Sequence, residues 1–143
     1  MIDLPASVTL IDLKDRMLNE FIIVANNKDE KKLIKTGNER VVEARLSDAN
    51  FFWNRDKSFN LIKQINKLKK IVFYENLGTV YDKTQRLRKM AYFISDQLNI
   101  NKEKLEIASS VSKSDLASDL VSEFPELQGE MGKYFALNQG FEQ

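Results

Sequence analysis

The sequence predicts a mainly α-helical protein of about six helices, preceded by a short N-terminal segment with β character. Only five glycines and two prolines occur in 143 residues, and apolar residues recur at spacings of three and four through most of the chain after residue 37. The hydrophobic share of 43% and the charged share of 30% are typical of a soluble globular domain. No apolar run approaches a bilayer span, and Met1–Leu10 lacks the pattern of a secretory signal. We therefore expect one cytoplasmic domain.

The N-terminal segment, residues 1–36, contains two candidate strands. Ser7–Leu13 alternates β-branched and polar residues, and Asn19–Asn26 holds a short apolar run, so the two could form a hairpin. Residues 10–21 also place apolar side chains at helical spacing, which leaves short helices as the alternative. Asn27–Thr36 is rich in charge and suits a linker or a short helix, and it is the best candidate for a domain boundary.

The segment Gly37–Asp56 is predicted to form one amphipathic helix. Asn38 suits the N-cap position after the flexible Gly37, and Glu39 suits the positive end of the helix dipole. A core-facing stripe then follows at spacings of four, three and four residues. This stripe consists of Val42, Leu46, Ala49 and Trp53.

Two further amphipathic helices are predicted between residues 59 and 98. In Phe59–Phe73 an apolar face opposes a lysine face. The apolar face holds Leu61, Ile65, Leu68 and Val72, and the lysine face holds Lys63, Lys67 and Lys70. Gly78 breaks the chain, and Thr79 with Asp82 has the spacing of a capping box that starts the next helix. The inner stripe of that helix is predicted to be Val80, Leu87, Ala91, Ile94 and Leu98.

The last three helices are each predicted from a residue that favours a helix start. Asn101 caps the first of them, and Ser112 with Asp115 starts the second. Pro125 ends the second helix and suits the first turn of the third, which Gly140 ends. Their inner residues are predicted to be Leu105, Ala108 and Val111; then Leu116, Leu120 and Phe124; then Leu127, Met131, either Tyr134 or Phe135, and Leu137.

The chain has no cysteine and no histidine. This composition excludes disulfides, thiolate nucleophiles and imidazole bases, and it removes almost every zinc or iron site. The sequence also has no glycine-rich phosphate loop. We therefore predict no catalytic, cofactor-binding or metal-binding residue in this chain.

The net charge of +1 conceals an uneven distribution. Residues 1–37 carry six acidic and six basic groups, residues 38–104 carry eight acidic against fourteen basic, and residues 105–143 carry seven acidic against two basic. The basic middle and the acidic end could attract each other within the fold. Alternatively, the basic middle could form an electropositive surface for RNA.

Five basic residues are the candidates for RNA binding. They are Lys63, Lys67, Lys70, Arg86 and Arg88. Ammonium groups on one helix face could follow a phosphate backbone, and a guanidinium can bind a phosphate through two parallel hydrogen bonds. A lysine stripe opposite an apolar stripe is, however, also the usual solvated face of a surface helix, and that alternative is the more common one.

The aromatic residues of the middle region could stack on bases, but at helical spacing they more often belong to the core. They are Phe51, Phe52, Trp53, Phe73 and Tyr74. Lys83 is placed near the edge of the apolar stripe, where a structural ion pair is its expected role.

Four stretches of the chain resemble, in the same order, the beta subunit of bacterial heterotetrameric glycyl-tRNA synthetase. They are Gly37–Asp56 (GNERVVEARLSDANFFWNRD), Glu75–Arg86 (ENLGTVYDKTQR), Ser112–Leu120 (SKSDLASDL) and Glu123–Tyr134 (EFPELQGEMGKY). Four ordered matches are far more specific than one short motif, and the resemblance covers about residues 37–140. Leu4, Pro5 and Val24–Asn26 also match the ends of a family stretch whose middle is much longer than here.

The resemblance implies an HD-like helical bundle for residues 37–143, because the family has in this region a helical domain similar to the HD phosphohydrolases. Residues 1–36 are then expected to be a remnant of a neighbouring domain plus a linker. An active HD site needs histidines and a His-Asp pair to hold metals, so that chemistry is excluded in this chain. Asp115 is accordingly expected to be a carboxylate at a helix start.

The resemblance also implies a part in glycine–tRNA ligase, which joins glycine to tRNA-Gly with ATP. In that family the alpha subunit activates the amino acid, while the beta subunit binds and positions tRNA and completes an alpha2-beta2 assembly. The implied partners are tRNA-Gly and the alpha subunit, with no membrane, and ATP is used by the holoenzyme. This chain alone, which lacks the family's C-terminal anticodon-binding region, is expected to be inactive. The alternative is a helical scaffold or subunit-interface domain without RNA contact.

Overall fold

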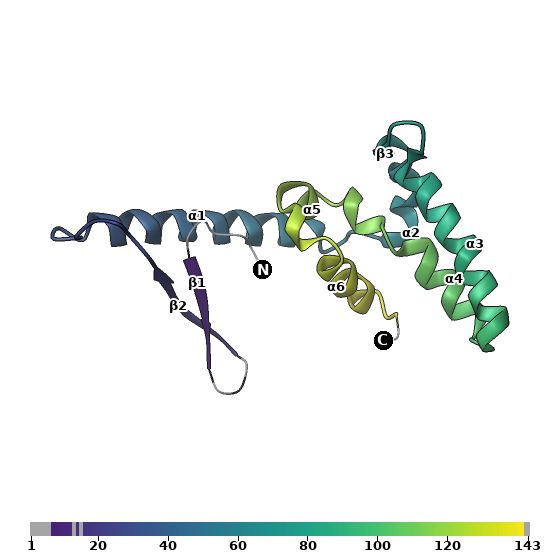
Figure 1. Ribbon diagram of the computed structural model, residues 1–143, viewed down its shortest axis with the longest axis horizontal. Coiled ribbons are helices and arrows are strands. Elements are labelled where there is room, and N and C mark those ends of the chain that lie inside the picture. Colours follow the sequence, from purple (N-terminus) through teal and green to yellow (C-terminus); the bar gives the residue numbers. More distant parts are fainter. Residues whose placement is uncertain (1–6, 13, 15, 142–143) are drawn as a thin grey trace. The chain divides into compact units, whose positions relative to one another are not determined.

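The computed structural model describes residues 7–12, 14 and 16–141 (Figure 1). Within these residues the chain is mainly helical, with six α-helices, three 3-10 helices and two short antiparallel hairpins, so the predicted class and helix count are confirmed. None of the helices in this part of the chain combines the length and hydrophobicity that a membrane crossing requires. Leu4, Pro5 and Leu13, which the sequence predictions used, lie outside the described residues.

The chain packs as two compact units, Met1–Asn50 and Phe51–Gln143. Helix α1 (Leu33–Asp56) passes through the point of division. The sequence predicted that residues 1–36 derive from a neighbouring domain and that residues 37–143 form the helical domain. The packing of the chain does not test from which domain a segment derives, so this division stays a prediction. The HD-like relationship of residues 37–143 stays a prediction as well.

The first unit begins with the predicted hairpin. Strands β1 (Ser7–Ile11) and β2 (Met17–Ile23) pair antiparallel, with Ser7 opposite Ile23 and Thr9 opposite Phe21. The strand prediction is therefore confirmed, and the helical alternative is wrong. Along β2 only Phe21 and Ile23 are half-buried, as the two-residue period of a strand requires.

Helix α1 starts four residues before the predicted start at Gly37. The carboxylate of Asp29 accepts hydrogen bonds from the backbone N–H groups of Ile34 (2.9 Å) and Lys35 (2.8 Å), so the free donors of the first turn are already satisfied there. Asn38 lies inside the helix, and its side chain donates to the carbonyl of Ile34 (2.8 Å). The prediction of Asn38 as the N-cap is therefore wrong, and the end of the predicted linker is helical.

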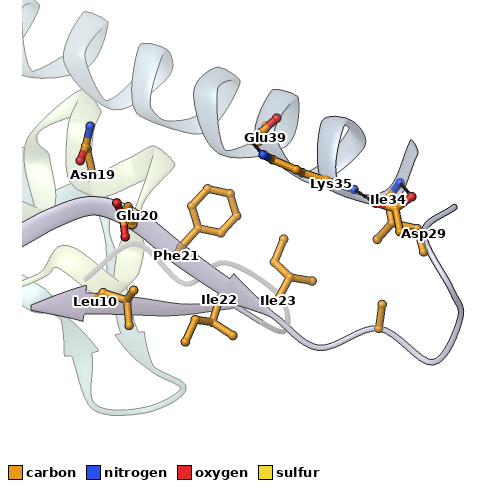
Figure 2. A pocket seen from close by; sticks show the side chains of 11 residues that line it. Leu10, Asn19, Glu20, Phe21, Ile22, Ile23, Asp29, Ile34, Lys35 and Glu39 are labelled. Atoms are coloured by element: carbon orange, nitrogen blue, oxygen red, sulfur yellow. Dashed lines mark hydrogen bonds and ion pairs between the residues drawn. The ribbon is translucent and has the colours of Figure 1, made fainter. Parts of the chain in front are cut away.

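The predicted core stripe of α1 is only partly buried. Val42 and Ala49 are half-buried, but Leu46 is 55% exposed. In the first unit, the residues of α1 that line the cavity beside the hairpin are Ile34, Lys35 and Glu39, from its first turns (Figure 2). Trp53, at the other end of the stripe, belongs to the second unit and stacks on Phe135 with 5.9 Å between ring centroids.

The predicted single helix over Phe59–Phe73 is wrong. The chain instead forms α2 (Leu61–Gln64), the 3-10 helix η1 (Ile65–Lys70) and strand β3 (Val72–Tyr74), which pairs with β4 (Gly78–Thr79). Residues 71–74 are Ile, Val, Phe and Tyr, which favour strands, and Asn76 and Gly78 take the positive φ angles that a tight turn needs. The helical spacing of Lys63, Lys67 and Lys70 favoured a helix, so the strand-forming residues 71–74 were wrongly included in it.

Helices α3 (Val80–Leu98) and α4 (Lys102–Val111) begin at their predicted caps. The Thr79–Asp82 capping box is present, and the Asn101 side chain accepts from the N–H of Lys104 (3.1 Å). The predicted inner stripe of α3 holds for its first three residues, since Val80 is buried and Leu87 and Ala91 are half-buried. Ile94 and Leu98 are exposed, and the other buried residues of α3 are the polar Thr84 and Ser95.

The C-terminal part contains η2 (Ser114–Ala117), α5 (Asp119–Glu123), η3 (Pro125–Leu127) and α6 (Glu130–Asn138). The predicted helix start at Ser112 is wrong, because the cap of α5 is Ser118, whose hydroxyl accepts from the N–H of Val121 (3.1 Å). Pro125 occupies the first turn of η3 and not that of the last helix.

Asp115 lies in the first turn of η2, as the prediction of a helix-start carboxylate requires, but it is buried and its carboxylate binds outside that helix. Its carboxylate accepts the backbone N–H of Gly129 at 2.6 Å, which fixes the approach to α6. Gly132 of α6 packs against it, since a Cβ at this position would lie 3.3 Å from the Asp115 carboxylate.

The core of the second unit is centred on Phe135, so of the two predicted alternatives Phe135 is buried and Tyr134 is exposed. The Phe135 ring lies 5.0 Å from the Phe59 ring, and each buried side chain of this size contributes about 1.5–3 kcal/mol. The Gln139 side chain accepts from the N–H of Leu61 (3.1 Å) and donates to the carbonyl of Phe59 (3.1 Å). The buried apolar residues are Phe59, Leu61, Leu68, Val80, Leu120, Val121, Phe124, Met131 and Phe135.

Asp56, the last residue of α1, is a buried carboxyl group in this core. It accepts the backbone N–H of Leu120 at 2.7 Å. Burial raises the pKa of Asp56 above its ordinary value, and the nearby charge of Asp119 adds to the increase, while the Leu120 N–H and Arg55 oppose it. The folded state therefore holds a proton on Asp56 more strongly than the unfolded chain does.

Replacing Asp56 with Asn should change how stability depends on pH. Because the pKa of Asp56 is raised on folding, its contribution to stability is complete below the unfolded pKa and is lost as the pH rises through the folded pKa. Asn does not titrate and can still accept the Leu120 N–H. Urea unfolding from about pH 3.5 to about pH 7 should show wild type losing stability relative to Asp56→Asn as the pH rises. A constant difference across this range would contradict the assignment.

Candidate nucleic-acid interface

A strongly basic segment, Lys57–Lys89, holds all five predicted RNA-binding residues. It carries nine lysines and arginines against only Glu75 and Asp82, a net charge of +7. The segment comprises α2, η1, the β3–β4 hairpin and the first half of α3, and Figure 1 shows β3 beside the start of α3. This concentration of positive charge in consecutive elements makes the segment the candidate interface.

The hairpin and the start of α3 are joined by a tight set of hydrogen bonds. The backbone N–H and the hydroxyl of Thr79 both donate to the Asp82 carboxylate at 2.7 Å, and the N–H of Asp82 donates to the Thr79 hydroxyl at 3.2 Å. Gly78 precedes this box with φ of +80°, and a Cβ there would lie 2.5 Å from the Asp82 carboxylate. Glycine is therefore required here by both conformation and space.

Two cations from different elements gather around Asp82. The Thr79 N–H and hydroxyl hold the pKa of Asp82 below its ordinary value, and the charges of Arg86 and Lys69 lower it further. Lys69 comes from η1 and Arg86 from α3. The Lys69 ammonium also lies 4.7 Å from the centroid of the Tyr81 ring, which helps to fix it.

Lys83 contacts an aromatic ring instead of the carboxylate that the sequence predicted. Its ammonium lies 4.0 Å from the centroid of the Phe73 ring on β3, and no described residue forms a salt bridge with it. Its charge is therefore held against the hairpin by a cation–π contact. An ammonium in such a position keeps its charge available to a second, anionic partner.

The structure separates the three lysines that were predicted to share one helix face. Lys63 lies on α2, whereas Lys67 and Lys70 lie on η1, and all three are exposed. The prediction of one lysine stripe is wrong because the winding changes between the two elements. In a 3-10 helix residues three apart lie on the same side, so Lys67 and Lys70 remain aligned. The RNA-binding role of the three lysines stays a prediction.

Arg88 is engaged inside the fold. Its guanidinium pairs with the Glu106 carboxylate and donates to the Gln85 side chain at 3.0 Å, and the Tyr92 hydroxyl donates to the same Glu106. These contacts join α3 to α4. A phosphate would have to compete with Glu106 for Arg88, whereas Arg86 is exposed beside Asp82. Of the two predicted arginines, Arg86 is thus the one placed for an external contact.

The predicted aromatic core is only partly found. Trp53 and Phe52 are half-buried, and Phe51 packs edge-on against Phe52 (5.3 Å between centroids) while remaining mostly exposed. Phe73 and Tyr74 project from β3, and Tyr74 is 67% exposed. Their exposure was missed because residues 59–73 were interpreted as one helix. The strand-forming run at 71–74 and the following Asn-Leu-Gly turn could have revealed it.

Concave regions also lie outside the basic segment. In the first unit, a cavity of about 660 Å³ separates the hairpin from the first turns of α1, where Phe21 and Ile23 point toward the helix and Lys35 pairs with Glu39 at 3.7 Å (Figure 2). In the second unit, a cavity of about 670 Å³ between α4 and the end of α6 is lined mainly by apolar side chains. No group of metal-binding side chains occurs in the described residues.

These features define a mainly helical protein whose most distinctive surface is a basic one around a short hairpin. The chain belongs to the family of glycyl-tRNA synthetase beta subunits, whose family model matches residues 6–143. The family predicted from the four ordered stretches is therefore confirmed.

Curated relatives agree with this assignment. The glycine–tRNA ligase beta subunit of Hahella chejuensis is 49% identical over 129 residues, covering 89% of this chain and 18% of the relative. That of Pseudomonas fluorescens Pf-5 is 44% identical over 133 residues (92% and 19%), and that of Syntrophomonas wolfei is 47% identical over 123 residues (85% and 18%). The chain thus spans about a fifth of the length of the curated relatives it matches.

Substituting Gly78 with alanine should loosen the junction between the hairpin and α3. The positive φ costs a non-glycine residue about 1–3 kcal/mol, and the new Cβ would also displace the Asp82 carboxylate from Thr79. Urea unfolding should show a loss of at least about this size. The matched control is Gly37→Ala within helix α1, where a Cβ meets nothing within 4 Å. This substitution should be neutral or stabilise the protein by up to about 1 kcal/mol. Equal effects of the two variants would contradict this account.

Proposed function

We propose that this chain is part of the beta subunit of glycine–tRNA ligase, where it binds tRNA-Gly, helps to position it and supports the alpha2-beta2 assembly. In this proposal residues 37–143 are the HD-like domain of the subunit, and the enzyme works in the cytoplasm. The observation that carries the proposal is the net charge of +7 in Lys57–Lys89, with cations from η1 and α3 around the hairpin. Family membership supports tRNA-Gly as the RNA.

Positioning is the contribution that such a surface can make. Lysine and arginine contacts to phosphates fix the register and orientation of an RNA without reading its sequence. Holding one reactant in place removes translational and rotational freedom that the reaction would otherwise have to overcome. Lys63, Lys67, Lys70 and Arg86 are exposed and suited to these contacts. Arg88 would act mainly by keeping α3 and α4 together.

The chemical step is proposed to belong to the alpha subunit, with ATP bound by the holoenzyme and not by this chain. The chain has no histidine, no cysteine and no glycine-rich phosphate loop. Among the described residues the two buried aspartates, Asp56 and Asp115, both accept backbone N–H groups. Histidine and cysteine, which acid–base and covalent catalysis often use, are therefore missing, and these two buried carboxylates are already engaged.

A second role, as a contact surface for other parts of the enzyme, is favoured by a different observation. The outer face of the second half of α3 exposes an apolar stripe at spacings of three and four residues. This stripe consists of Met90, Phe93, Ile94 and Leu98, all of them more than two-fifths exposed. Contiguous apolar surface of this kind is typical of protein contacts and not of RNA contacts. The two roles use different residues of the chain.

Binding of labelled tRNA-Gly to the chain should be tight at low salt and should weaken steeply as salt rises. Fluorescence anisotropy at a series of salt concentrations measures this dependence, beside an unrelated tRNA of equal length. Substituting Lys63, Lys67 and Lys70 together with Gln should reduce the slope of log K against log salt by about one unit for each phosphate contact that is lost. Preference for tRNA-Gly would add recognition to electrostatic attraction.

The matched control removes three exposed lysines outside the basic segment, Lys28, Lys31 and Lys133, again with Gln. It changes the net charge by the same amount, so it should leave the slope nearly unchanged if the basic segment is the binding surface. No binding at low salt would contradict RNA binding and favour the contact-surface role. If both triple variants reduced the slope of log K against log salt equally, the tRNA would be attracted by the overall charge of the chain and not by the basic segment.

The chain alone should not charge tRNA-Gly. Purified chain with ATP, labelled glycine and tRNA-Gly is expected to give no acid-precipitable glycyl-tRNA above a no-protein blank, because the catalytic groups are proposed to lie in the alpha subunit. Detectable charging without an added alpha subunit would contradict the proposed division of labour. A complete alpha and beta holoenzyme in the same assay shows that the tRNA and the reagents are competent.

A further inference from the structure

The β3–β4 hairpin presents apolar and aromatic side chains to water in the middle of the most basic part of the chain. The four side chains are Val72, Phe73, Tyr74 and Leu77, and each is more than a third exposed. Lysines and arginines surround them in sequence, from Lys67 to Lys70 before the hairpin and from Lys83 to Lys89 after it. A hydrophobic tip within a cationic surface matches a ligand that offers flat apolar faces beside negative charges.

The tip is held rigidly enough to serve as a binding platform. Tyr74 pairs with Gly78 across the hairpin, and the N–H of Leu77 donates to the Tyr74 carbonyl at 3.0 Å, which closes the turn. The Thr79–Asp82 box then joins the hairpin to α3. Little conformational freedom is therefore left for the backbone of Tyr74 to lose when a ligand binds.

The two aromatic rings of β3 differ in their availability. The Lys83 ammonium covers one face of the Phe73 ring at 4.0 Å from its centroid. The Tyr74 ring has no aromatic or cationic partner among the described residues, and it is 67% exposed. Tyr74 is therefore the ring with a free face. The Lys83 ammonium lies over the Phe73 ring and the Lys69 ammonium over the Tyr81 ring, so positive charge is held where the hairpin meets α3.

We propose that Tyr74 stacks on an unpaired nucleotide of an RNA whose flanking phosphates are neutralised by Lys69, Lys83 and Arg86. This inference rests on the proposed function, since it assigns one specific contact within the RNA-binding surface. Unpaired bases can leave the helical stack and lie on an aromatic ring, and such stacking does not depend on which base is present. The hairpin thus distinguishes an unpaired nucleotide beside a stem from a continuous duplex.

The test compares two labelled RNAs that carry the same number of phosphates. One is a blunt stem-loop, and the other is a shorter stem-loop with an unpaired 3′ extension. Affinities and salt slopes are measured by anisotropy for the full chain and for the variants Tyr74→Ala, Tyr74→Phe and Tyr134→Ala. Tyr134 is the matched control, because it is an exposed tyrosine on α6, outside the basic segment. Circular dichroism confirms that each variant is folded.

Wild type should bind the extended RNA about tenfold more tightly than the blunt one, in keeping with the stacking of a single base. Tyr74→Ala should lose this preference while its affinity for the blunt RNA and its salt slope stay the same. Tyr74→Phe should keep the preference, because the ring and not the hydroxyl makes the contact. Tyr134→Ala should behave as wild type.

The outcomes separate this inference from the proposed function. If wild type binds neither RNA in a salt-dependent manner, the RNA-binding function itself fails. If wild type binds both RNAs without preference, or if Tyr74→Ala keeps the preference, the stacking inference fails and phosphate binding stands. Weaker assembly of Tyr74→Ala with the alpha subunit, with RNA preference intact, would assign the hairpin to a protein contact and overturn the inference.

Discussion

The packing of Phe135 against Trp53 and Phe59 joins the last helix of the second unit to the start of that unit. The position of the basic segment depends on this packing. The Phe135 carbonyl also accepts from the Gln139 side chain at 2.7 Å. The same Gln139 side chain binds the backbone of Phe59 and Leu61. Residues about 80 positions apart are thus joined both by apolar burial and by hydrogen bonds that satisfy buried backbone groups. Because α2 begins at Leu61, these contacts fix where the basic segment leaves the core.

The hairpin is exposed because the core holds the chain on both sides of it. Leu68 of η1 and Val80 of α3 are both buried, and the N–H of Val80 donates to the carbonyl of Ile71 at 2.8 Å. Between these two positions Ile71 and Thr79 are half-buried, and the other residues are exposed to water. Lys69 directly follows one buried position, and Lys83 lies one turn of α3 after the other. The cations therefore stand at the base of the hairpin, which is why they contact Tyr81 and Phe73.

Sequence reasoning succeeded where the decisive contacts are local. The Thr79–Asp82 box and the Asn101 cap each use groups three residues apart, so their spacing is sufficient to predict them. It failed where a competing local group or a distant partner decides. Asp29, and not Asn38, accepts the N–H groups at the start of α1, and the bond from the Gly129 N–H to the Asp115 carboxylate joins residues 14 positions apart. Among the candidate site residues, the exposure of Lys63, Lys67 and Lys70 was predictable, whereas the engagement of Arg88 depends on Glu106, 18 residues away.

The partly polar inner face of α3 explains both why the end of the predicted stripe is exposed and why the two proposed roles use different residues. Its face toward α4 uses polar groups, with Arg88 and Tyr92 sharing Glu106 and with Ser95 buried. Most of those polar groups have partners within the fold, although the buried Nε of Arg88 has none, so the face can be buried with few apolar side chains. Met90, Phe93, Ile94 and Leu98 then fall on the outside, beyond the basic first half of the helix. A protein contact on the second half and an RNA contact at the hairpin can consequently exist together, and loss of one need not abolish the other.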